Sequence, residues 1–408
     1  MDPYVTESHR ALRSEVREFA EACVAPVATE LDEHSRFPWD TVRAMAERGW
    51  LGANVPQEYG GLGLDTLGYM LIIEELARVD ASHAITISAH STLGTSPILN
   101  YGTESQKRQY LPLLAAGRVL AGFGLTEPGA GSDAGATRTT AVRRNGEYTI
   151  TGSKIFITHA GVGEVFVVTA VTDREQGVKG ISSFIVTKET TDRATADRIG
   201  FGHAPELEPF TPGVRAGRKE DKMGWRASDT RELILDEARV PAENRLGGEG
   251  EGFVNFMKTL DAGRIGIAAL SLGLAQGAFD TAVQYVGSRV QHGRPLSGAQ
   301  GIQFTLADMA TEIAAARLLV YHAAWLKQNG HPFSSAASMA KLYASELAMR
   351  TTTRAVQLLG AAGYTSEYAV ERMMRDAKIC EIGEGTSEVQ RLLIGRSLFR
   401  TAGTGSDS

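Results

Sequence analysis

The spacing of apolar residues divides the chain into three regions. Up to about residue 120 apolar residues recur every three or four positions, as at Val16, Phe19 and Cys23, which predicts amphipathic helices. Between about residues 121 and 240 the spacing falls to two, and short runs rich in β-branched and aromatic residues predict strands. These runs are residues 148–158, 164–172, 181–188 and 232–236. From about residue 241 to 400 the helical spacing returns over longer segments.

The last region carries apolar stripes on successive segments. One stripe passes through Leu272, Ala275, Phe279, Val283, Val286 and Val290, and the next through Ile302, Leu306, Met309, Ile313, Ala316 and Val320. Stripes separated by short polar breaks are typical of a helical bundle. A Rossmann sheet is not indicated, because strands do not alternate with long helices.

We therefore predict an α+β fold in three parts with a tail. The parts are an N-terminal α-helical domain (1–120), a small antiparallel β-barrel or sheet domain (121–240), a C-terminal four-helix bundle (241–400) and a disordered tail (401–408).

Composition narrows the class of protein. The 408 residues carry a formal net charge of −6, whereas a nucleic-acid binder normally has a basic surface. No apolar run reaches the roughly 18–20 residues that span a bilayer, and the N-terminus has no signal or transit pattern. The two cysteines, Cys23 and Cys380, lie far apart, so neither a disulfide framework nor a metal site is expected. We expect a reduced, cytoplasmic enzyme that binds neither nucleic acid nor membrane.

Two segments at the β region are candidates for ligand contact. Residues 125–135 (LTEPGAGSDAG) combine glycines, which let backbone N–H groups approach a ligand, with the hydroxyls of Thr126 and Ser132. The run does not fit GxGxxG and equally suits a plain turn. In the predicted strand 152–158, Phe156 and Thr158 share one face, so Phe156 can pack on a flat ring while Thr158 bonds its edge. The alternative is an ordinary half-buried strand.

The third candidate is the loop at residues 382–388 (IGEGTSE). It places Glu384 between two glycines, ahead of an amphipathic segment for which Ser387 is the expected N-cap. A capping loop alone needs no chemistry.

These three segments, in this order and within an α, β, α pattern, closely resemble the acyl-CoA dehydrogenase family, and its short-chain branch in particular. The resemblance runs from about residue 7 to 400. Its most specific stretches are residues 125–135, 219–228 (KEDKMGWRAS), 260–270 (LDAGRIGIAAL), 298–310 (GAQGIQFTLADMA) and 382–395 (IGEGTSEVQRLLIG). It implies a homotetrameric FAD flavoprotein of lipid metabolism and fatty acid β-oxidation, with an acyl-CoA substrate and an electron-transfer flavoprotein as electron acceptor.

The resemblance also implies roles for individual residues. Glu384 matches the catalytic base, which removes the α-proton while the β-hydride passes to flavin N5. Substrate contacts are implied for Ser132, Asp261, Arg264 and Gly385, the second and third of which are expected near the start of a bundle helix. FAD contacts are implied for Phe123, Leu125, Thr126, Ser132, Phe156, Ile157, Thr158, Thr386, Ser387 and Glu388. Further FAD contacts, made across a subunit interface, are implied for Arg289, Gln300, Gln357, Leu358, Leu359, Gly360 and Ala361.

Physical chemistry supports a glutamate base only in a dry site. The ordinary pKa of a glutamate is about 4.3, and burial beside an apolar acyl chain raises it towards the operating pH. A related branch of the family carries its base on the bundle helix, at the position of Gly263 here. Glycine cannot act as a base, so Glu384 is the candidate that remains.

Four departures from the family pattern stand out. Gly383 replaces a usual tyrosine, which predicts a wider acyl site for short branched or medium chains. Phe156 replaces a usual tryptophan, and His292 a phenylalanine. Residues 189–212 are about twenty residues longer than the usual loop and are expected to be exposed, shaping either the CoA entrance or a subunit contact.

Other readings stay open. One is an oxygen-using relative, an acyl-CoA oxidase or flavin monooxygenase. Another is a flavin-binding scaffold without catalysis, which would be expected to lack Glu384.

Overall fold

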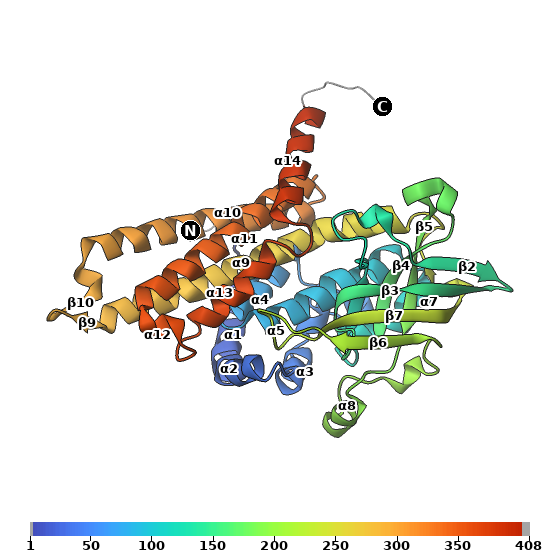
Figure 1. The fold of residues 1–408 in the computed structure, drawn as a ribbon, viewed down its shortest axis with the longest axis horizontal. Coiled ribbons are helices and arrows are strands. Elements are labelled where there is room, and N and C mark those ends of the chain that lie inside the picture. The colour runs from blue at the N-terminus through green and yellow to red at the C-terminus, as the bar shows by residue number, and fades with distance from the viewer. Residues whose placement is uncertain (1–2, 402–408) are drawn as a thin grey trace.

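The computed structural model describes residues 3–401 and contains two helical regions with a sheet between them in sequence (Figure 1). The N-terminal helices are α1 (Glu7–Phe19), α2 (Ala25–Glu33), α3 (Trp39–Glu47), α4 (Thr66–Ala77), α5 (Ala81–Ser88), α6 (Ser96–Tyr101) and α7 (Glu104–Ala115). Side-chain caps fix several starts: Asp65 Oδ1 accepts the N–H of Gly68 at 2.7 Å, and Thr103 and Gln106 form a capping box. A π-helical segment, η4 (Ala89–Thr95), joins α5 to α6.

The sheet confirms the four predicted strands as β3 (Glu147–Thr158), β4 (Val165–Val171), β5 (Ile181–Thr187) and β7 (Thr230–Pro241). It also contains β1 (Ala121–Gly124), β2 (Thr140–Arg144), β6 (Val214–Lys219) and β8 (Arg245–Leu246), in the order β6-β7-β3-β2-β4-β5-β8 with β1 on β4. Most pairs are antiparallel as predicted. The β1–β4 and β2–β4 pairs are parallel.

The C-terminal helices are α9 (Gly252–Ser288), α10 (Gln300–Gln328), α11 (Ser334–Leu359), the short α12 (Ala361–Tyr364), α13 (Val370–Cys380) and α14 (Ser387–Thr401). Figure 1 shows α9, α10, α11 and α13 side by side, with α14 standing away from them. The stripe predicted to reach Val290 ends with α9, since Val290 lies in β9 (Val290–Gln291), which pairs with β10 (Arg294–Pro295). Of the predicted tail, Thr401 ends α14 and residues 402–408 lie outside the described residues.

Helix α9 lies in the main apolar core of the molecule. By length and composition it could cross a membrane, contrary to the expectation from the sequence, but 78% of its most apolar window is buried inside the protein. It packs against α4, α10, α11 and α13, and one apolar core joins the N-terminal helices to the bundle. The sheet has an apolar core of its own. The domain boundaries at 120, 240 and 400 stay predictions.

The long segment 189–212 is only partly an exposed loop. It contains α8 (Arg193–Ile199), and Phe201, Ala204 and Leu207 are buried. Asp192 accepts the indole N–H of Trp39 at 2.8 Å, and Phe201 packs on the same ring. The segment therefore fastens the sheet to α3.

Candidate active site

The loop between α13 and α14 holds Glu384 in a conformation that side chains rarely adopt. Glu384 has a φ of 54° and the following Gly385 a φ of 93°. A Cβ on Gly385 would also lie 2.8 Å from Nε2 of Gln390, so only glycine fits there. A non-glycine residue in the left-handed region is the kind of strain that clusters at functional sites.

Two buried side chains fix this backbone. The carbonyl of Gly385 accepts from Nζ of Lys341 at 2.7 Å and from Nε2 of Gln390 at 2.9 Å, and Gln390 also donates to the carbonyl of Glu384 at 3.3 Å. Lys341 comes from α11 and Gln390 from α14, and both are fully buried. Neither was singled out from the sequence, because each contact joins residues that only the tertiary fold brings together.

The Glu384 carboxylate lies against α9 at Gly263. A Cβ built on Gly263 would be 2.0 Å from Oε2 of Glu384 and 3.3 Å from Cδ2 of Leu93. Oε2 is buried and has no hydrogen-bond partner among residues 3–401. Burial raises the pKa of Glu384 to about 7, although the charges of Lys341 and Arg264 lower it. The site thus contains a carboxylate that can take up a proton near neutral pH.

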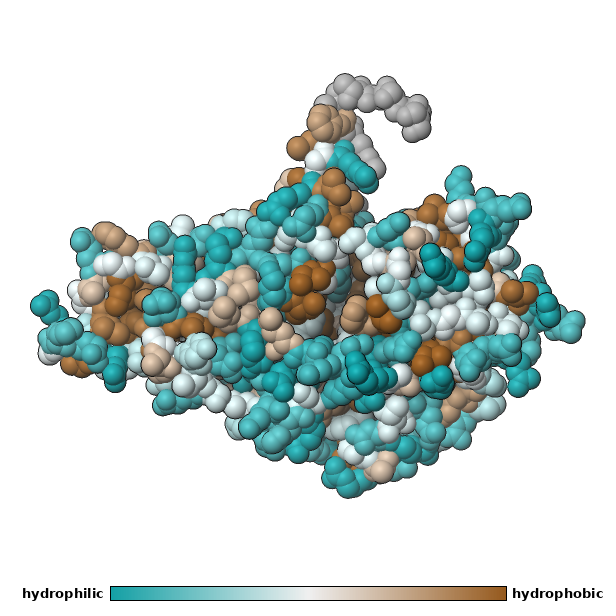
Figure 2. Space-filling view, viewed as in Figure 1, coloured by the Kyte–Doolittle hydropathy of each residue, from teal (hydrophilic) through white to brown (hydrophobic). Residues whose placement is uncertain are grey.

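Helix α9 also carries Asp261 and Arg264, which form an ion pair. They lie well inside α9, which begins at Gly252, and not near its start as predicted. The reason is that α9 continues through the apolar residues before the LDAGR sequence. Gly383 faces open space: a Cβ there would meet only the carbonyl of Ile379, at 3.5 Å. Figure 2 shows apolar side chains beside a recess at the junction of the bundle and the sheet region, below α14.

The sheet supplies a second wall with an outward-facing aromatic ring. A bulge in β3 between Lys154 and Ile157 gives Phe156 a φ of 58° and leaves it 62% exposed. Thr126 lies beside it, because its carbonyl accepts the N–H of Ile155 at 2.8 Å. Thr158 is half-buried, and Phe123 stacks on Phe256 with ring centroids 4.1 Å apart. An exposed ring on a strand that also carries Thr158 and pairs with the backbone of Thr126 fits a flat ligand with a polar edge.

Some predicted residues contribute less than expected. The side chain of Ile157 is buried in the sheet core, so only its backbone can face a ligand, and Leu125 is also buried. The cap of α14 is Thr386, whose Oγ1 accepts the N–H of Val389 at 3.3 Å, whereas Ser387 is the first helical residue. The prediction of Ser387 as N-cap was wrong because the glycine turn ends one residue earlier. Ser132 is exposed in the glycine-rich turn.

A buried ion pair supports this wall, and the sequence reasoning missed it. Glu127 accepts from Nζ of Lys154 at 2.7 Å and from the N–H groups of Arg138 and Thr139 at 2.6 and 3.1 Å. Burial opposes the charge, but Lys154 holds the pKa of Glu127 at about 2. The pair ties the glycine-rich turn to β3. The sequence did contain a signal for this pair. Lys154 occupies an inward position of a strand with alternating burial, and a buried ammonium needs a partner.

Similarity to known proteins decides the family. Models of the N-terminal, middle and C-terminal domains of acyl-CoA dehydrogenases match residues 6–118, 122–238 and 250–399 in turn. A short-chain specific acyl-CoA dehydrogenase from Clostridium acetobutylicum is 49% identical over 400 residues, covering 98% of this chain and 100% of the relative. The chain belongs to the acyl-CoA dehydrogenase family. It is accordingly an FAD-dependent oxidoreductase that dehydrogenates acyl-CoA.

Solved structures of similar proteins confirm the fold. The butyryl-CoA dehydrogenase of Megasphaera elsdenii is 44% identical with a TM-score of 0.91, covering 98% of this chain and 100% of that chain. A chain from a structural study of the electron transferring flavoprotein of Acidaminococcus fermentans is 48% identical with a TM-score of 0.91, at the same coverage.

The remaining predicted FAD residues of this acyl-CoA dehydrogenase lie at the other end of the bundle. Figure 1 places β9, β10 and α12 there, far from the sheet. Arg289, Gln300, Gln357, Gly360 and Ala361 are exposed, Leu358 is half-buried and Leu359 is buried. The structure therefore does not bring these residues together with Glu384 and Phe156 of the same chain.

Proposed function

We propose that Glu384 is the base that removes the α-proton of an acyl-CoA. The observation that carries this proposal is the buried Oε2, unpartnered among residues 3–401 and held against α9 by a strained loop. A free acceptor in a dry place is what a general base needs, and burial brings its pKa close to the operating pH. Gly263 cannot supply an alternative base.

The reaction converts the acyl thioester to the trans-2-enoyl thioester. FAD supplies the acceptor for the β-hydride. Glu384 takes the α-proton, so the two hydrogens leave as proton and hydride and a double bond forms. The N–H of Glu384 has no acceptor in the described part of the chain, which suits it to hold the thioester oxygen as charge develops there. Lys341 and Gln390 keep both groups in place.

For FAD we propose the residues that the family resemblance implies. Phe156, Thr126 and Thr158 meet the flavin, joined by Phe123, Leu125, Ser132, the backbone of Ile157, and Thr386, Ser387 and Glu388. The mostly exposed set Arg289, Gln300 and 357–361 completes the site of a neighbouring subunit in a homotetramer. Exposed apolar residues on the bundle, Phe304 (60%), Leu318 (50%) and Leu392 (57%), support such an assembly.

The substrate proposal is an acyl-CoA of short branched or medium chain length, bound by Ser132, Asp261, Arg264 and Gly385. The open space at Gly383 supports it. We propose a cytoplasmic protein with an electron-transfer flavoprotein as electron acceptor. Reoxidation of the reduced enzyme by that protein and not by air distinguishes it from an oxidase or monooxygenase.

The test of the base is anaerobic mixing with acyl-CoA, followed by flavin bleaching. We expect Glu384→Gln to bind FAD and to bleach at least about 10²-fold more slowly than the wild type. Glu381→Gln is the matched control, because Glu381 lies close by in sequence, at the C-terminal end of α13. Its carboxylate already pairs with Nζ of Lys378 at 2.6 Å. Bleaching of Glu384→Gln at the wild-type rate would refute the proposal.

A further inference from the structure

Lys341 is a buried cation in an unusual position. Its side chain is fully buried in the bundle, and its one hydrogen bond within residues 3–401 goes to the Gly385 carbonyl at 2.7 Å. No carboxylate of the described chain forms an ion pair with it. Burial lowers the pKa of Lys341 to about 8, so retaining the charge has a free-energy cost that some interaction must offset.

Holding the loop carbonyl is not enough to explain a charge there. Gln390 already donates to the Gly385 carbonyl at 2.9 Å, so that oxygen would be satisfied without Lys341. An apolar side chain of similar size would fill the space without desolvating an ammonium. The position of Lys341 therefore points to the negative group that the same loop presents.

The other charged or titratable groups around Glu384 are paired, neutral or exposed to solvent. On α9 Arg264 is engaged by Asp261, and at the end of α13 Glu381 is paired with Lys378. Burial raises the pKa of the Cys380 thiol on α13 to about 12, and burial also raises the pKa of Tyr69 on α4. On α14 Glu388 is exposed and Arg391 pairs with Glu346 of α11. Lys341 is the cation near Glu384 that has no ion-pair partner within residues 3–401.

We propose that Lys341 is the positioning residue of the catalytic base: its ammonium holds the Gly385 carbonyl, which aims Glu384, and supplies the unpaired positive charge that balances the Glu384 carboxylate. The inference rests on the proposed role of Glu384. It assigns two separable effects, one of hydrogen bonding and one of charge.

Two variants separate these effects. Lys341→Gln can still donate a hydrogen bond but has no charge, and Lys341→Met has neither. The matched control is Lys188→Met, because Lys188 is also buried, also binds backbone carbonyls (those of Gly163 and Glu189, at 3.1 and 2.6 Å), and lies in the sheet region. The rate of flavin bleaching by acyl-CoA is measured against pH. Bleaching reports only the flavin-bound fraction, so partial loss of folding does not alter the rate.

In the wild type we expect the rate to rise with pH through about 7, as Glu384 loses its proton. Both Lys341 variants should shift the midpoint of this rise in rate to higher pH by about one unit, because the carboxylate loses a nearby positive charge. Lys341→Met should also lower the limiting rate at high pH, by up to about 10²-fold, because the base is no longer aimed. Lys341→Gln should keep more of that rate.

If both Lys341 variants had the pH dependence and the limiting bleaching rate of the wild type, the inference would be overturned. A loss of stability equal to that of Lys188→Met with an unchanged pH profile would also overturn it, since that describes a structural lysine. Failure of the proposed function is a different result: there Glu384→Gln itself would bleach normally. If only the inference fails, Glu384→Gln is slow while the Lys341 variants behave as wild type.

Discussion

Gly263 on α9 and Glu384 on the loop after α13 compete for one small space. The place where a Cβ of residue 263 would lie is 2.0 Å from Oε2 and 3.0 Å from Cδ of Glu384. The carboxylate therefore needs glycine at 263, and Leu93 closes the same space from η4. In this chain, therefore, a side chain at position 263 and the carboxylate of Glu384 exclude one another.

From this we predict that Gly263→Ala keeps FAD but loses turnover. The methyl group would push the carboxylate aside, and a displacement of about 1 Å can lower a rate about 10²-fold. Steady-state kinetics with an artificial electron acceptor measures the effect. Gly287→Ala on the same helix is the control, because a Cβ there meets nothing within 4 Å. Equal turnover in both variants would show that the carboxylate does not lie where we place it.

At the scale of elements, the periodicity of apolar residues predicted those strands and helices that bury at least one face. It found β3, β4, β5 and β7, whose inward residues form the sheet core, and the long bundle helices. It missed β2 and β6, which carry mostly polar residues, and the short β1 (AGFG). The loop at 382–388 and Phe156 were recognisable because glycines and an aromatic residue mark them locally. Lys341 and Gln390 were not, since in sequence they are ordinary helical positions and only the packing of α11 and α14 brings them to Gly385.

The loop element also predicts chain-length preference. Since Gly383 leaves open space, kcat/KM should be highest for branched or medium acyl chains and lower for butyryl-CoA. Gly383→Tyr should reverse this order by filling that space, with KM for the longer chains rising by about tenfold or more, in line with the loss of one well-packed group. A series of acyl-CoA thioesters tests both proteins. A sharp optimum at butyryl-CoA in the wild type would contradict the wider pocket.

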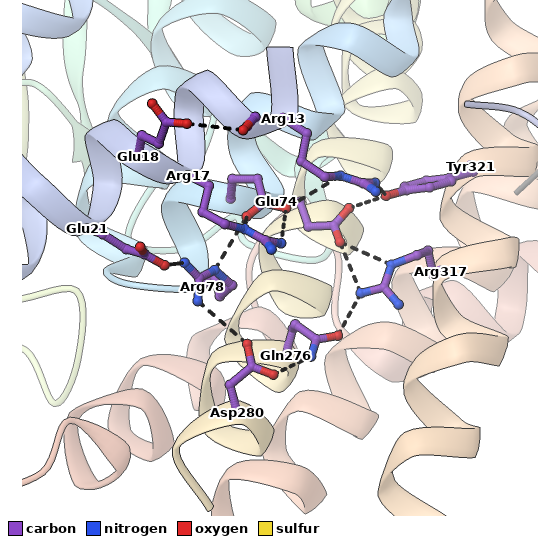
Figure 3. Close-up of polar contacts among 12 residues, drawn as sticks. Arg13, Arg17, Glu18, Glu21, Glu74, Arg78, Gln276, Asp280, Arg317 and Tyr321 are labelled. Atoms are coloured by element: carbon purple, nitrogen blue, oxygen red, sulfur yellow. Dashed lines mark hydrogen bonds and ion pairs between the residues drawn. The ribbon is translucent and has the colours of Figure 1, made fainter. Parts of the chain in front are cut away.

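At the scale of the whole molecule, both helical regions contribute to the wall around Glu384, through Leu93 of η4 and Gly263 of α9. A polar network joins these two regions (Figure 3). Glu74 on α4 accepts from Arg317 of α10 at 3.1 Å and from the hydroxyl of Tyr321 at 2.6 Å. Nearby, Arg17 of α1 donates to Glu75 at 2.9 Å. Glu74 and Glu75 are almost fully buried, so each depends on its partners.

We predict that Arg317→Met destabilises the folded protein by about 3 kcal/mol, because it leaves Glu74 buried without its main cation. Thermal or urea unfolding of the FAD-bound protein measures the change. Arg36→Met removes an exposed pair, 60% and 56% accessible, and should cost less than about 1 kcal/mol. Equal effects of the two substitutions would mean that the network contributes little to the free energy of unfolding.

The most direct test of the account follows the α-proton alone. A CoA thioester whose β carbon bears no hydrogen cannot be oxidised, but its α-hydrogens can still exchange with deuterium from the solvent if a base removes them. We expect wild type and Glu381→Gln to exchange them, and Glu384→Gln to be at least about 10²-fold slower. Exchange by Glu384→Gln at the wild-type rate would contradict the assignment of Glu384 as the base.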